Sequence, residues 1–113
     1  MSRSILTITT LCVALGTLHA QPFAVGSTNL TFTDPSRGGR SIPCEVYYPA
    51  ATPGAGVPVS PGAFPVLAFG HGFVMTTGAY TNLQQAFVPE GFILVLPTTE
   101  GGFAPSHGDF GLD

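Results

Sequence analysis

The residues best suited to chemistry lie in one short segment, FPVLAFGHGFVMTTGAY. Its apolar run ends at Gly70-His71-Gly72-Phe73. Glycines at the end of a strand let a substrate approach the main chain closely, and open α/β sheets bind ligands beyond the carboxyl ends of their strands. The backbone N–H of Phe73 is therefore a candidate donor to a developing oxyanion, supported by the glycines and by His71. The alternative reading makes Phe73 only an apolar wall.

Other polar residues fit simpler interpretations. His71, His107 and Asp109 lack the tight ligand spacing of a metal site, so no metal is expected. Glu100 and Asp109 are interpreted as solvated loop acids. No motif indicates an organic cofactor.

The elements ahead of the glycine pair predict an antiparallel hairpin. STNLTFTD and SIPCEVYYPA both alternate polar with apolar residues, and PSRGGR between them supplies a glycine turn. Cys44 is expected to be a small buried side chain. Residues 51–63 contain three prolines and no periodicity, which indicates a surface loop.

The following elements predict a βαβ unit. The continuous apolar runs VLAF and FILVLP are typical of strands covered on both faces. Between them an apolar stripe, with a start capped by Thr76 or Thr77, predicts a helix whose stripe residues are Tyr80, Leu83, Ala86 and Phe87. One helix leaves the opposite sheet face and an edge uncovered, so an incomplete fold is expected, with a further helical segment beginning near residues 111–113.

The first twenty residues have the charge, apolar core and small final residue of a secretory signal peptide, with an uncleaved membrane anchor as the alternative. Beyond them Arg37 and Arg40 are the only cations. This excludes nucleic-acid binding and a polybasic membrane patch, because both need a basic face. A secreted or periplasmic location is predicted, with no stable membrane anchor after cleavage.

Four pieces of the sequence together resemble the α/β-hydrolase family, in its secreted esterase branch of chlorophyllase-like, dienelactone-hydrolase-like, platelet-activating-factor acetylhydrolase-like and polyester-degrading members. These pieces are RSIPCEVYYPA, FPVLAFGHGF, YTNLQQAFVPEGFILVLP and SHGDFGLD. The resemblance implies that Phe73 N–H is one oxyanion donor and that residues after the turn, such as Tyr80, contact the substrate. Tyr80 as a core residue is the other interpretation. The resemblance also implies that the catalytic triad follows the order Ser, Asp/Glu, His along the chain. His71 is therefore interpreted as a turn-stabilising residue rather than the base.

The family's nucleophile motif G-x-S-x-G does not occur in this sequence. APSHG is the closest imitation and makes Ser106 an alternative nucleophile, although no buried strand leads into it. His107 is interpreted as a loop residue near the mouth of the site.

The sequence therefore predicts a signal peptide in residues 1–20 and, in residues 21–113, the amino-terminal portion of an α/β-hydrolase domain: an antiparallel hairpin followed by a βαβ unit of a mostly parallel sheet. The full-length form is expected to be a secreted serine esterase acting on a small-molecule, lipid or polymer ester, with the nucleophile outside this chain and the chain alone inactive. The alternative is a non-catalytic secreted binding module or a decayed hydrolase relative.

Overall fold

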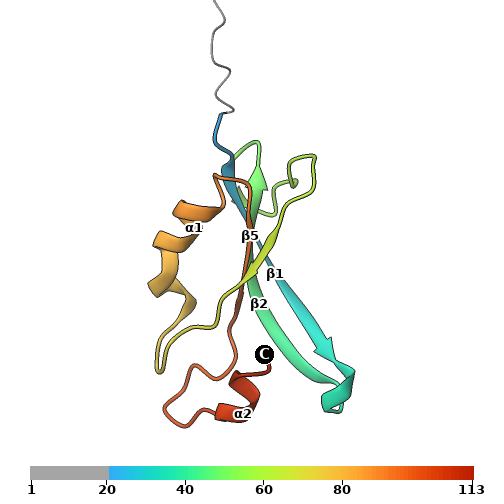
Figure 1. The fold of residues 1–113 in the computed structure, drawn as a ribbon, viewed down its shortest axis with the longest axis vertical. Helices are drawn as coiled ribbons and strands as arrows, with labels where there is room; N and C mark the ends of the chain where they lie inside the picture. Colours follow the sequence, from blue (N-terminus) through green and yellow to red (C-terminus); the bar gives the residue numbers. More distant parts are fainter. Residues whose placement is uncertain (1–20) are drawn as a thin grey trace, which may run out of the picture.

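The computed structural model describes residues 21–113, apart from the side chains of His107 and Phe110. The signal peptide predicted for residues 1–20 lies outside the described residues. The described chain forms one five-stranded mixed sheet with strand order β3-β1-β2-β5-β4 (Figure 1).

Strands β1 (Ala24–Asp34) and β2 (Arg40–Ala50) pair antiparallel along their whole length. A 3-10 turn, η1 (Pro35–Arg37), joins them. It ends at Gly38, whose φ of 66° lies in the left-handed region where a side chain would be strained. The predicted hairpin is confirmed.

Strand β4 (Val66–Ala68) pairs parallel with β5 (Ile93–Pro97), and β5 pairs antiparallel with β2. Between β4 and β5 lie the 3-10 helix η2 (Thr77–Tyr80) and the helix α1 (Thr81–Phe87). The predicted strand, helix and strand are therefore confirmed, and because their pairing is parallel, β4 and β5 have their carboxyl ends at the same end of the sheet.

Three details differ from the sequence prediction. The region predicted as a loop contains β3 (Gly54–Ala55), which pairs parallel with β1. The short helix α2 (His107–Phe110) lies before the point where a further helix was expected. Thr76 precedes η2 but makes no side-chain cap, so the predicted capping hydrogen bond is absent.

One face of the sheet packs against α1 (Figure 1). Val88, Leu94 and Leu96 are fully buried there. The helix turns Gln84 and Val88 to the interior rather than the predicted Phe87, which is exposed. The stripe differs from the prediction because the first turn of the expected helix is 3-10, whose tighter winding rotates the residues that follow.

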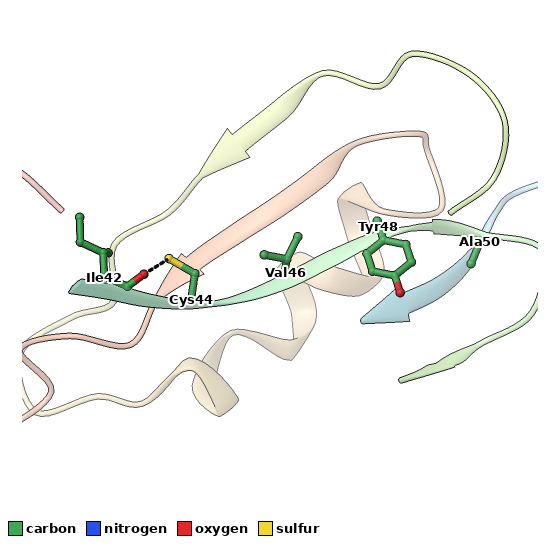
Figure 2. Packing of buried hydrophobic residues seen from close by; sticks show 5 residues of the cluster. All are labelled: Ile42, Cys44, Val46, Tyr48 and Ala50. Carbon is green, nitrogen blue, oxygen red and sulfur yellow. Dashed lines mark hydrogen bonds between the residues drawn. The ribbon is translucent and has the colours of Figure 1, made fainter. Parts of the chain in front are cut away.

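The opposite face carries the alternating side chains of β2, shown in Figure 2: Ile42, Cys44, Val46, Tyr48 and Ala50. Burial of Cys44 is confirmed, and this burial raises the pKa of its thiol. Toward the strands on either side this face opens, because Leu30 and Phe32 are each 47% exposed and Val66 is 61% exposed. The prediction that β4 is covered on both faces is therefore wrong for the described chain.

Within residues 21–113 no helix is both long enough and apolar enough to cross a membrane.

Candidate functional site

The chain leaves β4 through a segment that we call the β4 turn (residues 70–75). Its hydrogen bond runs from Met75 N–H to the Gly72 carbonyl over 3.0 Å. Val74, the third residue of this four-residue turn, has a φ of 56°. A left-handed third residue is typical of a type II turn, and it is unusual for a β-branched side chain. The sharp bend that the sequence assigned to glycines therefore includes Val74.

Gly72 fits the turn for a different reason, because the space around its Cα is tight. A Cβ atom built on Gly72 would lie 3.0 Å from Met75 Sδ and 3.1 Å from the Tyr80 hydroxyl. The Gly72 N–H donates to that hydroxyl over 2.6 Å. The turn is thus closed around a glycine whose amide is already occupied.

His71 is buried at the base of the β4 turn. Its Nε2 lies 2.6 Å from the Thr99 carbonyl oxygen, and its Nδ1 lies 3.0 Å from the Gly72 carbonyl oxygen. The shorter contact favours the tautomer with the proton on Nε2. His71 therefore joins the β4 turn to the segment that follows β5, a geometry compatible with the turn-stabilising interpretation.

Phe73 occupies the tip of the turn with its side chain 68% exposed. Among the described residues its N–H and that of Val74 have no hydrogen-bond acceptor, whereas the N–H groups of Gly72 and Met75, which flank this pair, do. Gly70 lies just ahead on the same exposed segment. The amide that the sequence singled out is thus one of the two unengaged amides at the tip of the Gly72–Met75 turn.

A cavity of about 230 Å³ lies beside the turn. It is lined by Glu45, His71, Met75, Thr76, Thr77, Thr98 and Gly101. Most of these residues follow the carboxyl ends of β4 and β5, so the cavity is at the end of the sheet where α/β folds bind ligands.

A second group of residues at the same end is charged. Arg40 donates to both Asp113 oxygens, at 2.9 Å from Nε to Oδ1 and 2.7 Å from Nη2 to Oδ2. Arg37 Nη2 lies 2.7 Å from Asp113 Oδ1. Thr99 Oγ1 also donates to Asp113, over 2.7 Å, and Arg40 contacts Glu100 at 3.0 Å. These contacts fasten the segment that follows β5 (the 98–113 segment) to the hairpin tip.

These contacts set the protonation of the charged groups. The pKa of Asp113 lies below its usual range, first because of its hydrogen bonds from Arg40. The pKa of Asp34 falls to about 2, first through its hydrogen bond from the Ser36 side chain and then through that from Arg37. The pKa of Arg37 is raised first by its hydrogen bond to Asp34, and the pKa of Arg40 first by its hydrogen bonds to Asp113. All four groups therefore remain charged at neutral pH.

Ser106 lies at the start of α2, exposed, and its hydroxyl accepts a hydrogen bond from Asp109 N–H over 3.3 Å. Its own N–H donates to Glu100 Oε2 over 2.6 Å. This is the arrangement of a helix N-cap. Asp109 also contacts Arg37 and Arg40 at 3.6 and 3.7 Å, so it belongs to the charged cluster. Among the described residues no group of three His, Cys, Asp or Glu side chains is arranged to hold a metal ion.

Sequence reasoning did not find the charged cluster. Asp113 was not singled out, and Glu100 and Asp109 were interpreted as solvated acids, whereas all three pair with arginines. The sequence does contain a pattern that indicates it: beyond residue 20 the chain has only two arginines and no lysine, both arginines lie beside one turn, and three of its six acids follow residue 98.

Comparison with known proteins identifies the fold. No family model matches the chain, and no curated protein matches it. A solved ferulic acid esterase from Streptomyces cinnamoneus is similar in structure, with a TM-score of 0.58 at 17% sequence identity. The match covers 75% of this chain and 36% of that chain, so the present chain spans about a third of the esterase's length. The described residues thus share the fold of part of an esterase.

Proposed function

We propose that residues 21–113 are the amino-terminal part of a secreted serine esterase of the α/β-hydrolase type, in which Phe73 N–H is one of the two oxyanion donors. The single observation that carries this proposal is the exposed tip of the β4 turn, where the N–H groups of Phe73 and Val74 have no acceptor among the described residues, while the amides of Gly72 and Met75 that flank this pair are hydrogen-bonded. In this fold class the loop after the third strand supplies one donor, and the residue after the nucleophile supplies the other.

The chemistry follows from that geometry. A serine hydroxyl attacks the ester carbonyl, and the carbonyl oxygen becomes an oxyanion that accepts hydrogen bonds from Phe73 N–H and the second donor. The intermediate collapses to an acyl-enzyme with loss of the alcohol, and water activated by a histidine releases the acid. The exposed Phe73 ring supplies an apolar surface beside the reacting carbonyl, and Tyr80 remains a candidate substrate contact. No metal or organic cofactor is part of this proposal.

The nucleophile, the base and the acid are proposed to lie outside this chain. We expect the coding sequence beyond Asp113 to contain a G-x-S-x-G motif about 50 to 80 residues after the β4 turn. The 113-residue chain should not hydrolyse p-nitrophenyl butyrate or methyl ferulate, whereas the product of the longer coding sequence should. Turnover by the short chain would contradict this part of the proposal, and its loss in Ser106→Ala would assign the nucleophile to Ser106.

The backbone donor can be removed by one substitution. Proline lacks an N–H and is common at the second position of a type II turn, which Phe73 occupies. Phe73→Pro in the longer product should lower kcat by about 10²–10³-fold. Phe73→Ala is the matched control, because it removes the ring and keeps the N–H, and it should lower kcat far less. Equal losses in the two variants would show that the side chain, and not the amide, is responsible.

The apolar face of the sheet favours a second function, that of a secreted binding module. A groove of about 550 Å³ lies on this face, and its lining includes Leu30, Phe32, Val59 and Val66. An early stop codon after Asp113, or a longer product with no elbow motif and no ester turnover, would favour this alternative.

A further inference from the structure

Tyr80 contacts both ends of the Gly72–Met75 turn with one oxygen atom. Its hydroxyl accepts the Gly72 N–H over 2.6 Å and lies 3.3 Å from Met75 Sδ, to which it donates. Gly72 and Met75 are the first and last residues of the hydrogen-bonded turn. The two residues between them, Phe73 and Val74, form its tip.

The position of this hydroxyl is fixed from the other side. Tyr80 ends η2 immediately before α1, and its ring packs edge-on against Phe69 with the ring centroids 4.8 Å apart. The Phe69 N–H donates to the Val95 carbonyl, so Phe69 extends the pairing of β4 with β5. Tyr80 also packs on the buried cluster that includes Leu94 and Leu96. The hydroxyl therefore holds the Gly72–Met75 turn in a fixed position relative to the sheet.

We propose that Tyr80 is a positioning residue for the oxyanion donor: its hydroxyl fixes the Gly72 amide and thereby the direction of the next amide, Phe73 N–H. This inference rests on the proposed function. It assigns the Tyr80 hydroxyl to the protein's own turn rather than to the substrate. It also explains why position 72 is glycine, because a Cβ there would lie within 3.1 Å of both partners of the contact.

The test compares Tyr80→Phe with Tyr48→Phe in the longer, ester-hydrolysing product. Tyr48 is the matched control, because its hydroxyl donates to the Val57 carbonyl over 2.7 Å on the opposite face of the sheet. Tyr80→Phe keeps the ring against Phe69 and removes only the hydroxyl. We expect kcat to fall about tenfold with KM unchanged, less than when the donor is deleted, because the amide remains but is misaligned. Tyr48→Phe should leave kcat within about twofold.

A double variant shows whether Tyr80 acts through Phe73. If it does, adding Tyr80→Phe to Phe73→Pro should cause almost no further loss of kcat, since the amide that Tyr80 positions is already gone. A full additional tenfold loss would overturn the inference, and so would a wild-type kcat in Tyr80→Phe.

Amide hydrogen exchange of the unmodified chain provides a test that needs neither a variant nor activity. The Gly72 N–H should exchange at least about tenfold more slowly than the Phe73 N–H, because only the first is hydrogen-bonded. Equal exchange rates would overturn the positioning role. Slow exchange at Gly72 in a product that hydrolyses no ester would instead refute the proposed function while the Tyr80 contact stands.

Discussion

Two segments meet at the carboxyl end of β4 and β5, and they are held by opposite kinds of interaction. The β4 turn is fixed by hydrogen bonds, from the Gly72 N–H to the Tyr80 hydroxyl and between His71 and the Thr99 carbonyl. The 98–113 segment is fixed by ion pairs, centred on Asp113, whose side chain is only 1% exposed. The second should therefore respond more strongly to added salt, and to protonation of Asp113, than the hydrogen bond between Gly72 and Tyr80.

This difference separates the roles of the two segments. In the proposed function, the oxyanion donor must hold its direction in the presence of substrate, and the hydrogen bonds of Tyr80 and His71 support the turn that carries it. A segment that is attached by charges can be released without disturbing the sheet. Thr99 is the residue at which the two systems touch, since its carbonyl contacts His71 and its hydroxyl donates to Asp113.

The largest loss of stability is expected from a substitution in β5, the strand on which both segments depend. Leu96 is fully buried on the helix-covered face, in the strand that leads directly to residue 98. Leu96→Ala should lower the free energy of unfolding by about 2–5 kcal/mol, through lost apolar burial and a cavity, and loosen both segments together. Urea unfolding measures this loss. Leu30→Ala on the open face is the control, and a loss as large as that of Leu96→Ala would show that the two faces contribute equally.

The two segments should differ in their sensitivity to acid. Asp34 and Asp113 both have lowered pKa values in the folded chain, so folding favours their deprotonated forms. Their contribution is complete above the unfolded pKa of about 4 and is lost as pH falls, for Asp34 through its folded pKa of about 2. Between pH 5 and about 2, amide protection should decline first at Leu112 and Asp113, whose N–H groups bond to Asp109, and later at Gly72. Loss of amide protection at the same pH in both segments would contradict this expected difference.

A smaller, local effect is expected from Arg40→Met, which keeps the apolar stem and removes the guanidinium. Asp113 would lose its two-point contact and retain Arg37. Exchange of the Leu112 amide should become about tenfold faster, and added salt should have less effect than in the unmodified chain. Glu90→Gln, an exposed change outside the cluster, is the control. Unchanged exchange in Arg40→Met would mean that these ion pairs contribute as little as ordinary surface pairs.

The hairpin and the strand–helix–strand unit could be predicted from the sequence, because local patterns of apolar residues specify them. Alternation predicted the hairpin, and two apolar runs around a helical stripe predicted β4, α1 and β5. The same patterns placed Phe73 at a turn after β4. Details that depend on tertiary contacts escaped: β3 is two residues long, and the 3-10 start of the helix rotated its buried stripe to Gln84 and Val88.

The charged cluster was not predicted from the sequence for a related reason. Arg40 and Asp113 are 73 residues apart in sequence, and a lone acid carries no periodicity that would indicate its partner. Only the sheet order, which places the hairpin tip beside the end of β5, brings them together. The contact between Gly72 and Tyr80 is closer in sequence, but an aromatic residue on a helical stripe is normally interpreted as core.

The smallest change in stability is expected from relief of backbone strain within the β4 turn. Val74 at a φ of 56° should cost roughly 1–2 kcal/mol relative to an unstrained residue. Glycine would remove that cost, but it adds about 0.5–1 kcal/mol of chain entropy on folding. Strain relief is the larger of the two, so Val74→Gly should raise the free energy of unfolding by about 0.5 kcal/mol, measured by urea unfolding. Val66→Gly, in an extended strand, is the control and should destabilise. A destabilised Val74→Gly would show that the Val74 side chain contributes packing that outweighs its backbone strain, and the β4 turn would then be held by apolar contact as well as by Tyr80.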